Sequence, residues 1–322
     1  MSPASVSRAF ESAVRARRLT KRFGATLAVD DLTFEVGAGS VFGLIGPNGA
    51  GKSTTFSMLA GYLQPTYGSV EILGWAPTAV DALRCRVGVL PQDAVLPTTD
   101  RVGEFLVHMA RLQGTSKNKA RESAERALDD VSGRDWWNER CGHLSHGMAK
   151  RVVLAQAFLG NPDVLLLDEP TAGLDPRVAW EVRQSILAKK GRSTIIVSSH
   201  NLNELEEVCD AAAIIDRGRL VATGSMAELT ATHEEIRVKV ASAGPNEAPI
   251  GPTRLAALRA LGDIKTVDLD EDRLEIVVRF DRSRTDAETV IARVLRLLLD
   301  EQVRISGVTK GRGLEKRVME IT

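Results

Sequence analysis

The sequence lacks the long apolar runs and paired cysteines that mark membrane-spanning and disulfide-rich proteins. No uninterrupted apolar run approaches the roughly 20 residues that a spanning helix needs, and the N-terminal stretch MSPASVSRAFESAVRARR has no apolar signal-peptide segment. The three cysteines, Cys85, Cys141 and Cys209, lie far apart and form no CxxC pair. This usage argues against a disulfide framework or a zinc site and fits a reducing cytosol. If the protein works at a membrane, another chain must do the spanning.

The chain also lacks an excess of charge of either sign. Lys and Arg total 42, and Asp and Glu total 42. Net charge therefore gives no basis for bulk attraction to nucleic acid or to an anionic membrane, and we expect no nucleic-acid partner. With 322 residues, of which 43% are hydrophobic and 26% charged, the chain is expected to be soluble and to form two domains, or one large domain with an appendage.

Strands alternate with helices over most of the chain, which predicts an α/β fold with a mostly parallel central sheet. Between about Pro97 and Leu144 the pattern is helical and charged, and it indicates a helical insertion. Buried strands are predicted at Val41–Ile45, Cys85–Leu90, Val164–Leu167 and Thr194–Val197.

The C-terminal part of the sequence has a different pattern. The stretch Ala241–Pro252, ASAGPNEAPIGP, indicates a linker or loop. With Ile236–Val240 as a first strand, the remaining pattern has the order of a small split βαββαβ domain. Its last helix, Ala287–Glu301, carries more apolar surface than one sheet face would need to cover. We therefore predict a separable α+β domain without catalytic groups, which stabilises a dimer or tunes its closure.

The segment GLIGPNGAGKSTT contains a phosphate-binding loop. Residues Gly46–Ser53 satisfy GxxxxGK[ST] directly after a buried strand and at a helix start. Phosphates need backbone N–H groups without obstructing Cβ atoms, Lys52 neutralises the β- and γ-phosphates, and Ser53 offers its hydroxyl to Mg²⁺. The predicted nucleotide-binding residues in this loop are Gly46, Asn48, Gly49, Ala50, Gly51, Lys52, Ser53 and Thr54.

A second element, DVLLLDEPTAGLDP, ends an apolar strand in two adjacent carboxylates. Ligands in open α/β sheets bind at the carboxyl ends of strands, where Asp168 and Glu169 fall. Asp168 would support Mg²⁺ through water, and Glu169 would polarise the attacking water. An apolar strand that ends in two acids is common by itself, so this interpretation depends on the phosphate loop.

A third element, LSHGMAKR at Leu144–Arg151, precedes a long apolar helix. Ser145 is a good N-cap, and the free N–H groups of a helix start favour an anion. Trp136 and Trp137 come shortly before it and are interpreted as packing residues, with docking of a partner as the alternative.

Together these elements resemble the nucleotide-binding subunits of ABC transporters, from Ala16 to about Leu229. The chain also carries Gln92 in VGVLPQD, the loop AGLDP at 172–176 and His200 in VSSH, which makes six separated motifs in family order. The resemblance implies a P-loop ATPase of the ABC type that binds ATP and Mg²⁺. Its implied parts are an ATPase domain at 14–230, with an antiparallel β part near the N-terminus and a helical subdomain at about 97–160, and a C-terminal domain at 231–322.

The resemblance also implies roles around the nucleotide. Phe23, where the family more often has Tyr, would stack on adenine, Gln92 would sense Mg²⁺ and water and contact the permease side, and His200 would contact the γ-phosphate. The alternatives are core packing for Phe23, a plain loop amide for Gln92 and a structural histidine at 200. The implied catalytic residues are Glu169, His200 and Gln92, and the implied Mg²⁺ ligands are Ser53, Gln92 and Asp168.

In that family, the signature motif of one subunit closes over the ATP held by its partner. Ser145, His146 and Gly147 would therefore act in trans on a second copy or a homologous subunit, and Asp175 would join the two sites across the interface. The commonest signature has Gly and Gln where this chain has His146 and Met148, and Met148 cannot make the reciprocal capping-box bond. His146 either adds a pH-dependent charge beside the phosphate or is an ordinary exposed histidine.

The resemblance implies an ATPase subunit at the cytoplasmic face of the membrane, peripheral through a separate permease. The signature and the final residues GLEKRVMEIT are similar to the exporter branch, which favours export. The alternative is a non-transport ABC-type ATPase with a regulatory, nucleic-acid or ribosome-associated role. The sequence does not name a cargo, because the permease selects it.

Overall fold

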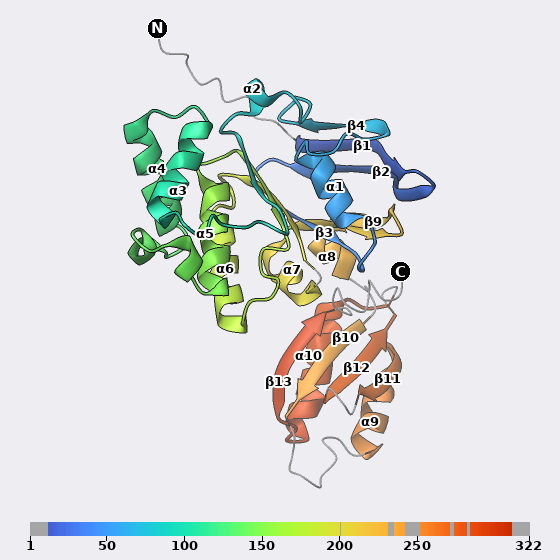
Figure 1. The fold of residues 1–322 in the computed structure, drawn as a ribbon. Helices are drawn as coiled ribbons and strands as arrows, with labels where there is room; N and C mark the ends of the chain where they lie inside the picture. Colours follow the sequence, from blue (N-terminus) through green and yellow to red (C-terminus); the bar gives the residue numbers. More distant parts are fainter. Residues whose placement is uncertain are drawn as a thin grey trace. The chain divides into compact units, whose positions relative to one another are not determined.

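The computed structural model describes residues 12–199, 201–230, 235–241, 252–270, 274–281 and 284–310, with the backbone alone at 252–254 and 310. The chain divides into two compact units between Met226 and Ala227, and each is described by itself (Figure 1). In the described ranges, none of the helices combines the length and the apolar character needed to span a bilayer.

A six-stranded sheet forms the centre of the first unit. Its strands are β3 (Val41–Ile45), β5 (Val87–Leu90), β6 (Val164–Asp168), β7 (Thr194–Ser198), β8 (Ala211–Asp216) and β9 (Arg219–Ser225). The strand order is β5-β6-β7-β3-β8-β9, and neighbours are parallel except β9, which runs antiparallel to β8. Every residue of β3, β6 and β7 is buried, as expected for apolar strands covered on both faces. The predicted mostly parallel sheet is confirmed.

One predicted strand boundary is wrong. The strand predicted at Cys85–Leu90 begins at Val87. Cys85 has a φ of +60°, which lies outside the extended region that a strand requires. The apolar pattern of the segment therefore predicts the strand but not the turn at its start.

A second, antiparallel sheet lies near the N-terminus, as predicted. It has the order β2-β1-β4 and consists of β1 (Ser12–Phe23), β2 (Thr26–Gly37) and β4 (Tyr67–Ile72). Its apolar face shares one core with helix α1 (Lys52–Leu59) and with the central sheet. The rings of Phe34 on β2 and Phe42 on β3 stack in this core with centroids 5.6 Å apart.

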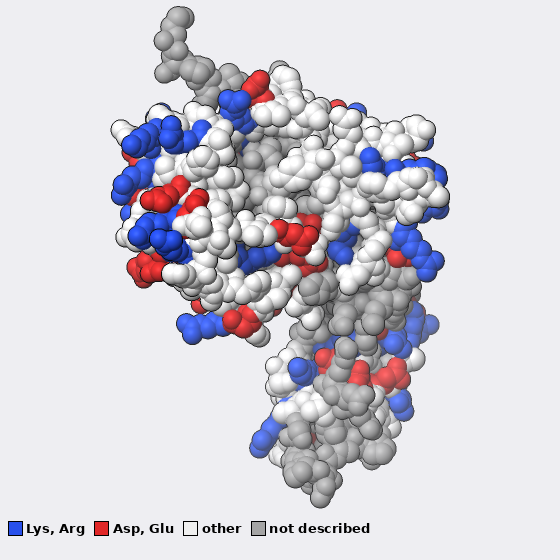
Figure 2. Space-filling model, in the orientation of Figure 1, with Lys and Arg blue, Asp and Glu red and all other residues white. Residues whose placement is uncertain are grey.

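The predicted helical part is also confirmed. Its main helices are α3 (Val102–Leu112), α4 (Lys117–Asp129) and α5 (His146–Phe158), which pack against one another (Figure 1). Figure 2 shows acidic and basic side chains interspersed over this part of the surface. The remaining helices of the unit are α2 (Val80–Leu83), α6 (Pro176–Leu187) and α7 (Leu202–Val208), with short turns at Arg134–Trp136 and Cys141–His143, and α8 (Met226–Thr230) spans the division between the units.

Trp136 and Trp137 pack within the helical part. The Arg151 guanidinium lies 4.5 Å from the Trp136 ring centroid, and the Arg121 guanidinium lies 5.5 Å from that of Trp137. A Cβ atom on Gly103 would lie 2.4 Å from the Trp137 ring, so α3 approaches this ring closely. These contacts support the packing interpretation.

The described part of the second unit has the predicted order β-α-β-β-α-β. Its elements are β10 (Glu235–Val240), α9 (Pro252–Arg259), β11 (Ile264–Asp270), β12 (Glu275–Phe280), α10 (Ala287–Asp300) and β13 (Ile305–Lys310). The sheet is antiparallel with the order β11-β12-β10-β13. The residues predicted as a linker at Ala241–Pro252 lie outside the described residues, apart from those at the two ends.

Helix α10 uses most of its apolar surface within its own unit. Val290, Val294 and Leu298 are buried in the core, and Ile291, Leu295 and Leu297 are partly buried against it. Of the seven apolar side chains of this helix that are larger than alanine, only Leu299 is exposed, at 60%. The predicted surplus of apolar surface is therefore wrong for the other six, because α10 packs on a four-stranded sheet beside α9.

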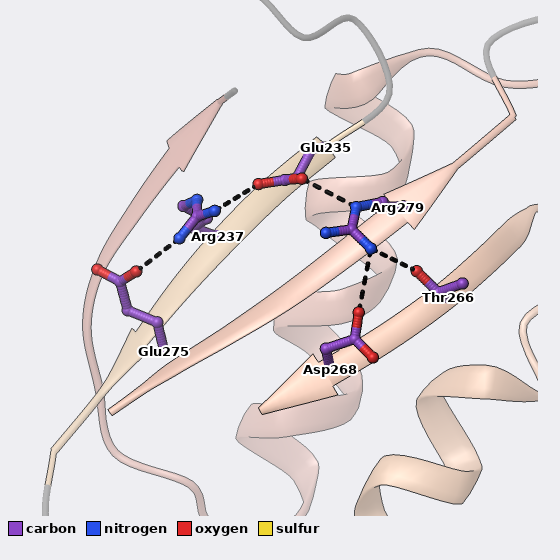
Figure 3. Close-up of polar contacts among 6 residues, drawn as sticks. All are labelled: Glu235, Arg237, Thr266, Asp268, Glu275 and Arg279. Carbon is purple, nitrogen blue, oxygen red and sulfur yellow. Dashed lines mark hydrogen bonds and ion pairs between the residues drawn. The ribbon is translucent and has the colours of Figure 1, made fainter. Parts of the chain in front are cut away.

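The sheet face opposite this core carries an ion-pair network with two buried members, Glu235 and Arg237 (Figure 3). Arg237 on β10 pairs with Glu235 at 2.7 Å and with Glu275 at 3.1 Å, and Arg279 on β12 pairs with Glu235 at 3.0 Å and with Asp268 at 3.1 Å. Glu235 is 2% and Arg237 6% exposed. The two buried charges, Glu235 and Arg237, are tolerated because each is paired, and the network links β10, β11 and β12.

Candidate functional site

The phosphate loop connects the end of β3 to the start of α1. Gly51 has a φ of +100°, and a Cβ atom there would lie 2.6 Å from the Ala28 carbonyl oxygen. A Cβ atom on Gly46 would lie 2.2 Å from the Ile215 carbonyl oxygen. These two positions require glycine, because the loop passes directly beside the neighbouring backbone.

The loop borders a cavity of about 280 Å³ at the carboxyl edge of the central sheet. Lys52 is buried, and its Nζ donates to the carbonyl oxygens of Gly46 at 2.8 Å and Pro47 at 3.1 Å. Burial holds the pKa of Lys52 below its usual value, although the carboxylates of Glu169 and Asp168 act to raise it. The cavity is lined by Ala28, Asn48, Gly49, Gly51, Lys52, Ser53, Thr54, Gln92 and Glu169.

Two predicted loop residues do not line this cavity. Ala50 is buried, and its carbonyl oxygen accepts a hydrogen bond from the Gly218 N–H at 2.9 Å. Gly46 holds Lys52 through its carbonyl oxygen. Both residues therefore shape the loop from behind.

Asp168 and Glu169 lie at the end of β6 and are 5% and 7% exposed. Burial raises the pKa of Asp168, and hydrogen bonds from Ser198 and Ser53 act in the opposite direction. The Glu169 N–H donates to Ser198 Oγ at 3.0 Å, and Glu169 has a φ of +49°. The strand thus ends in a sharp turn that brings the Glu169 side chain to the cavity.

The three predicted Mg²⁺ ligands lie together. Ser53 Oγ donates to Gln92 Oε1 at 3.3 Å, and Ser53 lies close enough to Asp168 to lower the pKa of its carboxyl group. A hydroxyl, an amide oxygen and a carboxylate form the all-oxygen donor set that Mg²⁺ prefers. The residues therefore fit this ion beside the phosphate loop.

Phe23 ends β1 and is 49% exposed, so the core-packing alternative is wrong for this residue. Lys21 Nζ lies 5.2 Å from its ring centroid. Phe23 does not line the cavity, and its ring is available for contact from outside. His200 lies outside the described residues.

The signature residues begin α5 and do not line this cavity. Ser145 is the N-cap, as predicted, and its Oγ accepts from the Met148 N–H at 3.3 Å. Ser145 and His146 are exposed and Gly147 is half-buried. A Cβ atom on Gly173 would lie 3.3 Å from His146 Nε2, so the signature lies beside the loop at 172–176.

Asp175 follows that loop and caps α6. Its Oδ1 accepts from the Val178 N–H at 3.1 Å, and the side chain of Asp175 is otherwise exposed. A Cβ atom on Gly147 would lie 3.1 Å from Val178 Cγ1. The starts of α5 and α6 are therefore neighbours within one chain.

A model of the ABC transporter family matches residues 29–172. The chain is 40% identical over 213 residues to Nod factor export ATP-binding protein I of Burkholderia lata. The matched segment covers 65% of this chain and 69% of the relative. The chain is 38% identical over 221 residues to the daunorubicin/doxorubicin resistance ATP-binding protein DrrA of Streptomyces peucetius. That match covers 67% of this chain and 66% of the relative. The chain belongs to the ABC transporter family.

Solved structures agree with this assignment for the ATP-binding subunit. An ATP-binding subunit of an ABC transporter superposes with a TM-score of 0.62 at 28% identity, over 68% of this chain and 92% of that chain. The cbiO1 protein of Clostridium perfringens, part of the cbiONQ ABC transporter complex, superposes with a TM-score of 0.61 at 25% identity. That match covers 68% of this chain and 91% of cbiO1. The predicted ATPase of an ABC transporter is confirmed, and the non-transport alternative is not favoured.

Several polar residues of the ATP-binding subunit make contacts that the sequence does not predict. Thr171 Oγ1 donates to Glu204 Oε2 at 2.6 Å, and Arg183 pairs with Glu204 at 3.0 Å. These contacts tie the loop after β6 to α6 and α7. The one sequence signal for Thr171 is its place in DEPTAGLD, whereas Arg183 and Glu204 lie on helices without a motif.

Lys150 on α5 was also missed. It is half-buried, and burial lowers its pKa while Asp168, Glu169 and Asp93 act to raise it. The signature helix thus places a cation in the field of the carboxylates of its own chain.

Proposed function

We propose that two copies of this subunit, or one copy and a homologous subunit, enclose two Mg·ATP molecules between them. ATP hydrolysis then opens the dimer and drives a separate membrane permease, with the subunit held at the cytoplasmic face through that permease. The single observation that carries the site assignment is the cavity where Lys52, Ser53, Gln92 and Glu169 meet at the carboxyl edge of the sheet.

The proposed nucleotide contacts combine residues that line the cavity with Asp168 and Phe23, which do not line it. The phosphates lie along the backbone of the loop, with Lys52 beside the β- and γ-phosphates. Ser53, Gln92 and Asp168 hold Mg²⁺, Asp168 through water, and the bound ion supplies positive charge against the phosphates. Phe23 stacks on adenine from its exposed position at the end of β1.

Glu169 is the proposed group that orients and polarises the attacking water. Its turn at the end of β6 brings the carboxylate to the cavity that Ser53 and Gln92 also line. His200 is proposed to contact the γ-phosphate. Gln92 sits at the cavity edge and is exposed, which suits the proposed contact with the permease side.

The dimer is proposed because the signature lies away from the cavity of its own chain. Ser145, His146 and Gly147 present the start of α5 without lining that cavity, and a helix start favours an anion. A partner's ATP supplies that anion. Asp175, on the neighbouring helix start, is proposed to join the two sites across the interface.

Export is the proposed direction. The compared relatives are named for Nod factor export and for daunorubicin and doxorubicin resistance, and these names favour export. The compounds in the names are those of the relatives and are not assigned to this chain. We further propose that the two units correspond to an ATPase domain at 14–230 and an accessory domain at 231–322 that stabilises the dimer or tunes its closure.

The substitution Glu169→Gln tests the proposed site. It keeps the size of the side chain and removes the charge that orients water, so we expect ATP turnover to fall at least about 100-fold while ATP binding persists. Steady-state ATPase and nucleotide-binding assays measure the two effects. Glu122→Gln, at an exposed position on α4, is the matched control. Wild-type turnover in the Glu169 variant would show that another group polarises the water.

A further inference from the structure

One buried hydroxyl connects the two carboxylate residues of the site. Ser198 is the last residue of β7 and is 0% exposed. We infer that Ser198 is a positioning residue for ATP hydrolysis, because its hydroxyl fixes the Asp168 carboxylate and the Glu169 backbone relative to each other. This inference rests on the proposed roles of Asp168 and Glu169.

The strand register places the hydroxyl where it can serve both residues. β6 and β7 are parallel neighbours, and Asp168 is paired with Ser198 across them. Ser198 Oγ donates to Asp168 Oδ1 and accepts from the Glu169 N–H at 3.0 Å. A serine hydroxyl has one hydrogen to donate and lone pairs to accept, so one side chain makes both bonds at the same time.

The first bond orients the carboxylate that is proposed to support Mg²⁺. Oδ1 of Asp168 accepts a hydrogen bond from the Ser198 hydroxyl. This bond fixes the orientation of the carboxylate relative to β7. Partners of this kind, which orient a metal-supporting group, are commonly worth about 10-fold to 100-fold in metal affinity or activity.

The second bond holds the turn that presents Glu169. A φ of +49° is uncommon for a residue with a side chain, and it persists only where the surroundings hold it. The Glu169 N–H is anchored to Ser198 at this turn. The carboxylate that would polarise water therefore keeps a fixed relation to Asp168.

Two other serines near β7 make different contacts. Ser199 Oγ accepts from the Asn201 N–H at 3.0 Å and so holds the start of α7. Ser193, directly before β7, is 5% exposed and donates to the Pro162 carbonyl oxygen at 2.7 Å. Ser193 matches Ser198 in residue type and burial but lies at the opposite end of the strand from the carboxylates, so Ser193→Ala is the control.

The test compares Ser198→Ala, Ser198→Thr and Ser193→Ala in the full chain, with its permease where turnover requires it. In Ser198→Ala we expect kcat to fall about 10-fold to 100-fold, with little change in the KM for ATP at saturating Mg²⁺. A second readout does not depend on activity: Mn²⁺ binding in the presence of ATP, measured by electron paramagnetic resonance, should weaken about 10-fold. Ser198→Thr, which keeps the hydroxyl, should recover both quantities, and Ser193→Ala should match wild type.

Two outcomes would overturn the inference. The first is a Ser198→Ala protein with wild-type kcat and Mn²⁺ affinity. The second is an equal loss in Ser193→Ala, which would indicate general packing of β7. Glu169→Gln, measured in parallel, separates these failures from a failure of the proposed function: if that variant also turns over ATP at the wild-type rate, the site assignment itself is wrong.

Discussion

At the scale of single residues, backbone shape decides what the phosphate loop tolerates. Gly51 combines a φ of +100° with a Cβ position 2.6 Å from the Ala28 carbonyl oxygen, so any side chain there meets both strain and a backbone clash. Lys52, the next residue, begins α1 and depends on this turn for its position.

We therefore predict that Gly51→Ala weakens ATP binding by about tenfold or more, because a left-handed conformation costs a residue with a side chain about 1–3 kcal/mol and the clash adds to it. Equilibrium binding of a fluorescent ATP analogue measures this. Gly191→Ala is the control, since Gly191 has a φ of +80° with open space around its Cβ position and lies outside the cavity. Equal loss of affinity in both variants would contradict the prediction.

The phosphate loop and the acidic strand end could be predicted because their chemistry lies in consecutive residues. Ser198 could not, because its role depends on which residue of a neighbouring strand lies opposite it, and β6 and β7 are separated by a loop and α6. The contact between Thr171 and Glu204 likewise joins a loop to a helix that follows another strand.

At the scale of helices and strands, continuous apolar runs were the most informative pattern. β3, β6 and β7 match their predicted positions within one residue because both faces of each strand are buried. The predicted start of β5 was wrong because the left-handed backbone at Cys85 does not alter the apolar pattern of the sequence. The buried charges of β10 were also missed, since Glu235 and Arg237 look like solvent-facing residues of an alternating strand.

The network on β10 makes a prediction about stability. Glu235→Gln removes the carboxylate that Arg237 and Arg279 share, and we expect it to destabilise the second unit by about 3 kcal/mol. Hydrogen exchange of the β10 and β12 amides reports on this unit alone. Asp268→Asn alters a pair whose carboxylate is 58% exposed and should change stability by less than about 1 kcal/mol. A smaller effect at Glu235 than at Asp268 would show that the network is not the main support of this face.

At the scale of the whole molecule, the chain has two units, each with its own apolar core. The solved ABC structures cover about two thirds of the chain, at 68%. The order of elements in the second unit could be predicted from the sequence. Its contribution to the dimer could not, because that depends on contacts with another chain.

Truncation after Thr230 addresses that contribution. We predict that the shortened chain still binds ATP, because the cavity is lined entirely by residues of the first unit, but that it dimerises more weakly. Sedimentation and ATP binding give the two quantities, and circular dichroism verifies folding. A folded truncated chain that binds no ATP would contradict the proposed domain division.

The most direct test of the account asks whether the signature acts on the ATP of the partner subunit. Lys52→Ala removes the charge beside the phosphates, and Ser145→Arg places a bulky cation at the start of α5, so each homodimer should fail to occlude ATP. A verified mixed dimer of differently tagged chains, prepared with the permease if needed, has one site built from the intact phosphate loop of one chain and the intact signature of the other. We predict that this mixed dimer regains occlusion of labelled ATP. A mixed dimer that occludes none, under conditions in which wild type does, would contradict the action of Ser145 in trans.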